Sequence, residues 1–279
     1  MRRLVVFSLL AGLAGAGLAA QPVTLRFRFA PEEQTTYKLT ITGAGISKIM
    51  NQSQPLQVNG ELLLKQKTLA VDPQGNGQLE TTPSAAKLAF TVRGQDQPQT
   101  VPTQPVTETI SPLGEPLSAK GAEGPPRGFT WSGLPGLRKL LGSVQFPLLP
   151  ERAVAAGQEW SDKLLLEVGG KKVTVEQKST LESFVRVGGR DCAQIKTQFT
   201  LPIEINTPPN PLGMTETMRG TERVSRTTLF DPEAGRIVRQ ETSLVFVLEV
   251  QIIVPAEAGK QVIPGSLELR MRVVAEAQP

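Results

Sequence analysis

A serine and a lysine stand three residues apart in the stretch Ser84-Ala85-Ala86-Lys87, which has the pattern S-x-x-K. In this pattern the serine hydroxyl is a nucleophile for acyl transfer, and the lysine amine lies close enough to activate it. The two side chains meet if the segment is helical, because residues three apart lie on one face of a helix. The chemistry therefore depends on the secondary structure at Ser84.

The sequence around Ser84 favours a strand. Residues 88–92 alternate large apolar residues with small or polar ones, which is the two-residue period of a half-buried strand. The companion elements S-D-N and K-T-G of penicillin-recognising enzymes are absent. We therefore interpret the S-x-x-K pattern as a chance occurrence. A second pair, Ser161 and Lys163, would share one face of a strand, where we expect a solvated edge.

The sequence contains no histidine and one cysteine, Cys192. Without histidine the chain has no Ser-His-Asp triad, no Cys-His pair and no ordinary zinc site. The aspartates are isolated from one another, so no D-x-D-x-D calcium loop can form; they are Asp72, Asp96, Asp162, Asp191 and Asp231. No phosphate-binding G-x-x-x-x-G-K loop occurs. We therefore predict no catalytic residues, no metal site and no cofactor.

The remaining candidate groups have ordinary structural interpretations. Glu32, Glu33 and Glu159 stand near expected strand starts, where we interpret them as surface charges. Cys192 is one residue out of phase with the apolar set that begins at Ala193. We therefore expect a partly exposed thiol, and nothing nearby in the sequence marks it as activated.

Residues 1–20 have the three-part design of a secretory signal peptide, with Arg2 and Arg3, an apolar run and then small residues. The run is too short and too rich in Gly and Ala for a membrane span, which needs about 20 strongly apolar residues. We therefore predict a periplasmic or extracellular mature chain without a stable membrane anchor. Loss of the two arginines lowers the formal net charge from +4 to +2, so we expect no nucleic-acid partner.

Alternation of apolar and polar residues dominates the rest of the chain. The apolar sets with two-residue spacing lie within residues 23–29, 37–41, 62–64, 88–92, 173–175, 193–203, 244–252 and 267–273. Such one-sided alternation is typical of antiparallel sheets with one wet face. The stretches DPQGNG at residues 72–77 and FDPEAGR at residues 230–236 have the composition of turns between strands.

The middle of the chain differs in composition. Residues 95–126 are rich in Pro, Gln, Thr and Gly, which predicts a surface connection with one short extended piece interrupted by a turn. Residues 132–142 favour a short amphipathic helix, because Leu134, Leu137 and Leu141 recur at helical spacing after a serine and Pro135 suits a first turn.

These patterns predict a mainly β protein with long antiparallel strands in a curved sheet, a half-barrel or barrel, and one short amphipathic helix. We expect a single β-rich domain over residues 21–279, with two loosely similar halves at about 21–120 and 146–279. The apolar faces fit both a filled core and a wall around a cavity for an apolar ligand. Their marker residues are Phe27, Leu39, Phe90, Phe199 and Phe246.

The stretches FPLLPERAVAAGQEW, at residues 146–160, and FDPEAGR carry a resemblance. They resemble uncharacterised exported bacterial β-rich families in which F-P-x-x-P leads to G-x-x-W and then to long strands. The architecture is also similar to the half-barrels of periplasmic lipoprotein carriers, whose helices cover an apolar concave face that binds acyl chains. This likeness implies a hydrophobic ligand and supplies no catalytic residues. Within the first stretch we interpret Trp160 as a packing anchor at the start of a strand.

The sequence therefore favours a non-enzymatic, exported cell-envelope protein that binds a hydrophobic small molecule or an envelope protein. Its ligand-binding residues are not identified by any motif. Two alternatives stay open at this point. One is a hydrolase that uses carboxylates or Ser84 and Lys87. The other is a structural or interaction module without a ligand.

Overall fold

The computed structural model describes residues 21–278 except 51, 100–103, 121–145, 169–170, 208, 210–212 and 257–258. The expected signal peptide and the expected helix at residues 132–142 lie outside the described residues. The strands are β1 (Gln34–Ile49), β2 (Gln52–Val71), β3 (Gly77–Val92), β4 (Gln95–Gln99), β5 (Val106–Ile110), β6 (Pro116–Lys120), β7 (Glu159–Val168), β8 (Lys171–Val187), β9 (Arg190–Asn206), β10 (Thr215–Asp231), β11 (Arg236–Ala256) and β12 (Gly259–Ala277).

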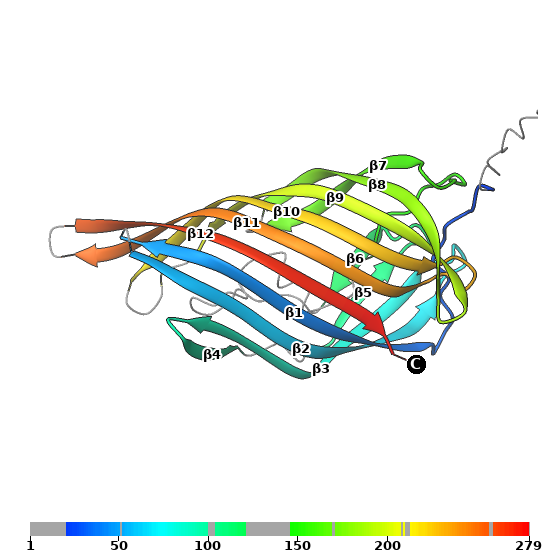
Figure 1. The fold of residues 1–279 in the computed structure, drawn as a ribbon, viewed down its shortest axis with the longest axis horizontal. Coiled ribbons are helices and arrows are strands. Elements are labelled where there is room, and N and C mark those ends of the chain that lie inside the picture. Colours follow the sequence, from blue (N-terminus) through cyan, green and yellow to red (C-terminus); the bar gives the residue numbers. More distant parts are fainter. Residues whose placement is uncertain are drawn as a thin grey trace, which may run out of the picture.

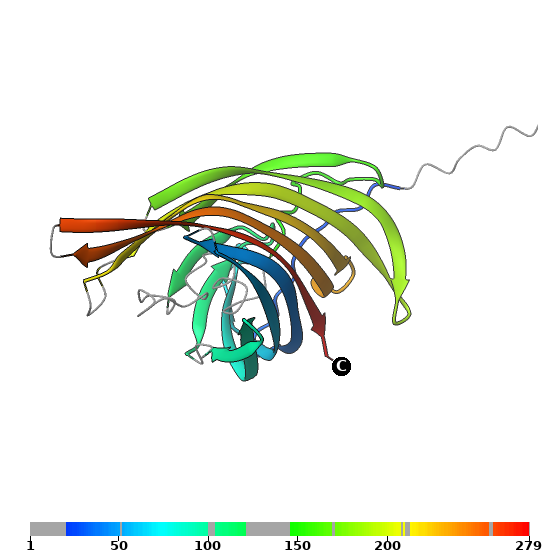
Figure 2. The ribbon, with the colours of Figure 1, turned by 60° about the vertical axis from the view of Figure 1, so that its left-hand side comes forward.

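All twelve strands belong to one antiparallel sheet in the order β6-β5-β3-β2-β1-β12-β11-β10-β9-β8-β7, with β4 paired to β3. The sheet curls into an unclosed half-barrel, so that the strands at its two edges are not hydrogen-bonded to each other (Figures 1 and 2). This confirms the predicted mainly β fold with long antiparallel strands in a curved sheet. No described helix is long and apolar enough to cross a membrane.

The hairpin turns follow from the residues that the sequence places there. Between β2 and β3, the Asp72 carboxylate accepts hydrogen bonds from the backbone N–H groups of Gln74 and Asn76, both at 2.9 Å. Between β10 and β11, the Asp231 carboxylate accepts from the N–H groups of Glu233 and Ala234. Both turns confirm the prediction, and both lie at the same end of the half-barrel, here named the closed end.

Alternation along each long strand separates the two faces of the sheet. Side chains of one parity are buried on the concave face, as Tyr37, Leu39 and Ile41 are in β1, while their neighbours Lys38 and Thr42 are exposed on the convex face. The concave sets of β1, β2, β3 and β8–β12 belong to one apolar cluster. All five apolar marker residues named above are in or against this cluster.

The segment at residues 21–33 corrects one expectation. Its alternation predicts a strand, but the segment adds only an isolated bridge between Val23 and Val154 and is otherwise extended outside the ladder. Its backbone N–H groups donate instead to three separate loops or strand ends, at Pro112, Gly235 and Thr68. The segment therefore crosses the closed end and ties together distant parts of the sheet.

An aromatic cluster fills the closed end behind this segment. The ring of Phe27 meets Phe230 edge-on at 5.1 Å between centroids and Phe146 at 4.9 Å, while Phe29 stacks alongside it. Leu149 is buried beside the cluster, and its N–H donates to the carbonyl of Leu113. Edge-to-face rings of this kind contribute about 0.5–1.5 kcal/mol beyond the area that they bury.

Two more expectations need correction. Residues 95–126 are not simply a connection, since they include β4, β5 and β6, although β5 and β6 do flank the predicted turn. The expectation of a partly exposed Cys192 is wrong, because the residue is fully buried. Burial raises the pKa of the Cys192 thiol, and the negative charge of Asp231 raises it further.

Candidate ligand-binding wall on the concave face

The middle of the concave face is an apolar wall built from strands that are distant in sequence. In one cross-strand row, Phe246 of β11 lies between Glu222 of β10 and Leu269 of β12. In the next row towards the opposite end of the sheet, here named the far end, Leu248 pairs with Leu267. The four apolar residues are each at most 3% exposed, so the wall is dry along β11 and β12.

The described chain covers this wall from outside the sheet at one end only. Among the described residues, the buried apolar side chains outside the strands are Leu25, Phe27, Pro147, Leu148, Leu149, Pro150 and Val154. The segments that hold them are bonded to the loops of the closed end and to the neighbouring start of β7. The described segments outside the strands therefore reach the closed end, while the side chains in the middle of the wall are at most 3% exposed.

Glu222 interrupts the apolar wall. It is 1% exposed and sits between the concave-face side chains of Leu201 on β9 and Phe246 on β11. One of its carboxyl oxygens, Oε2, is buried without a hydrogen-bond partner. Burial raises the pKa of Glu222 to about 7, and the positive charge of Arg226 opposes that rise.

Glu216 repeats this situation nearer the far end of β10. It is 8% exposed, and its Oε1 atom is also buried without a hydrogen-bond partner. Its cross-strand neighbour on β11 is Ile252. Burial raises the pKa of Glu216 to about 7. Six residues separate the two glutamates, so their backbones are about 20 Å apart along the strand.

Arg226 belongs to a row of hydroxyl groups closer to the closed end. Its Nε–H donates to Thr242 Oγ1 at 3.4 Å, and its neighbour Thr197 shares a 3.0 Å hydrogen bond with Ser179. Burial lowers the pKa of Arg226 to about 10. Four residues separate Arg226 from Glu222, about 13 Å along the strand, so the two side chains act on each other at a distance.

Gly220 lets β10 bend next to Glu222. Its φ of 154° lies in the range that side chains avoid, and a Cβ there would overlap the carbonyl oxygen of Val247 on β11. Gly220 pairs with Leu248, so the position that admits no Cβ falls within the apolar wall. The glycine therefore shapes the wall beside the buried carboxyl.

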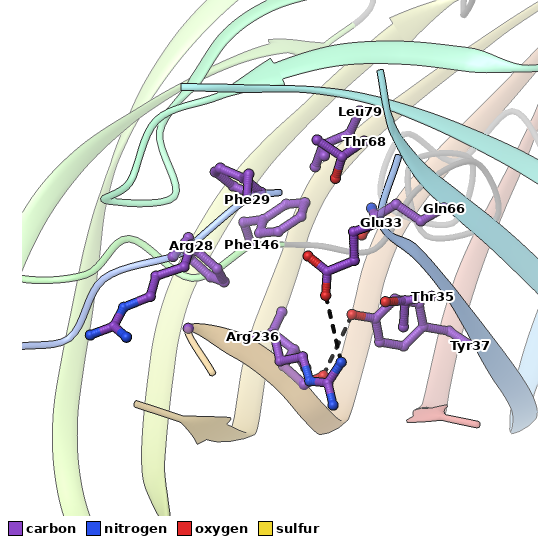
Figure 3. A pocket seen from close by; sticks show the side chains of 13 residues that line it. Arg28, Phe29, Glu33, Thr35, Tyr37, Gln66, Thr68, Leu79, Phe146 and Arg236 are labelled. Atoms are coloured by element: carbon purple, nitrogen blue, oxygen red, sulfur yellow. Dashed lines mark hydrogen bonds and ion pairs between the residues drawn. The ribbon is translucent and has the colours of Figure 1, made fainter. Parts of the chain in front are cut away.

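A small pocket at the closed end differs from this wall (Figure 3). Its volume is about 30 Å³, which is room for a water or two. Its polar groups have partners, since the Tyr37 hydroxyl donates to the carbonyl of Ile237 at 3.5 Å and the Glu33 carboxylate lies 3.6 Å from Arg236. Burial raises the pKa of the Tyr37 hydroxyl. The pocket is therefore a satisfied polar gap too small for an acyl chain.

The sequence candidates do not assemble into a reactive centre among the described residues. Ser84 lies on β3, as the alternation predicts, and its hydroxyl donates to the carbonyl of Leu63 at 3.5 Å rather than to Lys87. A bulge with Ala85 at a φ of 48° separates the two side chains. Ser161 and Lys163 are both exposed on β7, as expected for a solvated edge.

The acidic candidates are dispersed in the same way. Glu32 forms an ion pair with Lys67, and Glu159 accepts a weak hydrogen bond from Thr180. Within the described ranges, no group of three or more acidic or cysteine side chains could hold a metal ion. Trp160 is the second residue of β7, packs against the apolar cluster and donates from Nε1 to the carbonyl of Leu148 at 2.9 Å, which confirms its role as a packing anchor.

Sequence reasoning missed Glu216, Glu222 and Arg226. The signal was present, because all three share the parity of Met218 and Phe230 in the β10 sequence TETMRGTERVSRTTLF. A strand that buries its methionine and phenylalanine must turn these charged side chains to the same face. No other long strand that contacts the apolar cluster carries three charged residues on its buried face within the described residues.

Comparison with known proteins gives little beyond this geometry. No family model matches the chain, and no curated protein matches it. One similar solved structure is described as lipid–protein interactions in lipovitellin, with 12% sequence identity and a TM-score of 0.45. The match covers 90% of this chain and 26% of that one, so this chain spans about a quarter of its length.

Proposed function

We propose that this protein is an exported, non-enzymatic binding protein of the cell envelope that holds a long apolar ligand against its concave face. The observation that carries this proposal is a single-layer curved sheet with a continuous apolar wall. The described chain covers that wall only at the closed end. The proposal of export rests on residues 1–20. The proposal of a non-enzymatic role rests on the lack of histidine in the sequence and on the separation of Ser84 from Lys87 among the described residues.

The energetic argument concerns the part of the wall away from the closed end. Phe246, Leu248, Leu267 and Leu269 are already at most 3% exposed. The gain on binding would therefore come from the hydrocarbon of the acyl chain, at about 0.8 kcal/mol for each CH₂ group that leaves water. β11 has 21 residues and is therefore about 70 Å long, whereas an acyl chain spans about half of a 30 Å bilayer core. The wall is long enough for such a ligand with room left beyond it.

The experiment combines extraction with titration. Protein secreted from cells that express the full chain is purified without detergent, and its organic extract is analysed by mass spectrometry. We expect a bound long-chain lipid, together with saturable fluorescence when the apolar probe N-phenylnaphthylamine is added. An empty extract and a flat titration would together refute the proposal.

A matched pair of variants locates the site. Leu248→Trp fills the concave wall, since Leu248 is 2% exposed, and we expect it to weaken probe binding at least tenfold. The neighbouring Val247 is 47% exposed on the convex face, so Val247→Trp should leave binding unchanged. Equal binding by the two variants, at matched thermal stability, would place the probe elsewhere.

A further inference from the structure

The apolar wall contains two acceptor groups that the described protein leaves unsatisfied. Glu216 and Glu222 project from β10 into the concave face, at 8% and 1% exposure, and each has a buried oxygen without a partner. A buried polar atom without a hydrogen bond costs about 1–3 kcal/mol, and more if it is charged. These two positions therefore reduce the stability of the wall that they interrupt.

The groups around the carboxyls do not relieve that cost. Glu222 has Leu201 on β9 and Phe246 on β11 as cross-strand neighbours, and the charged group that acts on it is Arg226, about 13 Å away along its own strand. Glu216 lies beside Ile252, and burial is the dominant influence on its carboxyl. Glu222 is thus an acceptor between apolar neighbours, whereas Glu216 lies beside the Thr207 hydroxyl, which is engaged with the Glu216 backbone and not with its carboxyl.

We propose that Glu222 and Glu216 bind the polar groups of an amphiphile that donates hydrogen bonds and carries no negative charge, such as a long-chain alcohol or amine. This inference rests on the proposed function, because the hydrocarbon part of the ligand lies on the same wall. A hydroxyl or ammonium group supplies the missing donor. A fatty carboxylate would place a second negative group against an unpaired acceptor.

Arg226 lies about 13 Å from Glu222 along the β10 backbone. Its Nε–H donates to Thr242, and the row that it occupies also holds the hydroxyl groups of Thr197 and Ser179. The buried unpartnered atoms on β10 are carboxyl oxygens. The unpartnered groups on β10 are therefore acceptors, while one buried donor without a partner, Gln177 Nε2, lies on β8.

The test compares three ligands with one chain length, dodecylamine, dodecanol and dodecanoate, as competitors of N-phenylnaphthylamine at pH 7.5. For the wild-type protein we expect the amine and the alcohol to displace the probe at concentrations at least tenfold lower than dodecanoate. Glu222→Gln should weaken binding of the amine at least fivefold more than it weakens binding of the probe. Glu216→Gln provides a second reading of the same effect.

Glu268→Gln is the matched control, because Glu268 is exposed on the convex face of β12 between Ile46 and Val247. It should behave as the wild type. If all three ligands compete equally in wild type and Glu222→Gln, the inference is overturned while the apolar site stands. If the probe binds but dodecanoate is preferred, the inference is also overturned. If the probe never binds, the proposed function itself fails.

Discussion

The closed end and the middle of the concave face belong to the same sheet but differ in whether their buried polar groups have hydrogen-bond partners. At the closed end, Phe27, Phe146 and Phe230 interlock, and the polar groups of Tyr37, Glu33 and Arg236 have partners. In the middle, the wall is equally apolar, yet Glu222 has a buried oxygen without one. The polar groups of the first region are paired as in a folded core, whereas the second region holds a buried acceptor without a partner, on which the proposed ligand site rests.

The largest expected effect is the loss of stability when the aromatic cluster of the closed end is disrupted. Phe230 is fully buried in edge contact with Phe27, so Phe230→Ala should lower the free energy of unfolding by about 3–5 kcal/mol. Urea unfolding measures this change. Phe184→Ala is the control, because Phe184 is 38% exposed, and an equal loss in both variants would remove the distinction between core and periphery.

The second prediction concerns pH in the ligand-free protein. The pKa of both Glu216 and Glu222 is raised to about 7 from an ordinary 4.5, so the folded state keeps protons that the unfolded state has released. Stability is therefore full below pH 4.5 and falls as pH rises through 7, by about 2–3 kcal/mol for each carboxyl.

Unfolding in urea at several pH values between 4.5 and 8 measures that slope. The groups acting on Glu222 are apolar on β9 and β11, with Arg226 as the charged contributor on β10. In a Glu216→Gln, Glu222→Gln double variant, the free energy of unfolding should change less with pH over this range than it does in the wild type. The same slope in both proteins would show that these carboxyls do not titrate as described.

The third prediction separates stability from binding. Glu222→Met replaces a buried acceptor by an apolar side chain of similar size, so at pH 8 it should raise the free energy of unfolding by about 1–3 kcal/mol. The same variant should lose the preference for dodecylamine. Thermal unfolding and probe competition measure the two effects. A destabilised Glu222→Met would mean that Glu222 serves the fold.

The smallest effect is expected at the pocket of the closed end. Glu33 and Arg236 form a half-exposed pair with side chains 38% and 37% exposed, and such pairs contribute about 0–1 kcal/mol. Glu33→Gln should therefore change stability by less than 1 kcal/mol and leave probe binding unchanged. Weakened probe binding in this variant would move the ligand from the concave wall to the closed end.

The strands could be predicted because apolar and polar residues alternate along the sequence with a two-residue period. β11 buries Leu244, Phe246 and Leu248 on one face as their spacing indicates. Alternation does not say whether an extended segment joins a ladder, and residues 23–29 alternate like a strand while they bond to loops instead. Curvature without closure was among the predicted forms, but only the pairing order distinguishes it from a complete barrel.

The candidate site was harder to predict, because charged residues are normally placed on the wet face. The even-numbered residues of β10 face the core, and Glu222 and Arg226 are among them. In the sequence alone, the same charged residues make the apolar alternation of this strand weak. Cys192 shows the opposite case, since its phase suggested exposure and the folded protein buries it. Tertiary packing decides both positions.

The central claim is tested most directly by photocrosslinking with a long-chain alcohol that carries a diazirine near the end of its chain. The purified protein is irradiated with the bound probe and digested, and the labelled peptides are identified by mass spectrometry. We predict labels on concave-face residues of β10, β11 and β12, and their loss in Leu248→Trp. Labels confined to convex-face residues, or an unchanged pattern in Leu248→Trp, would contradict the account.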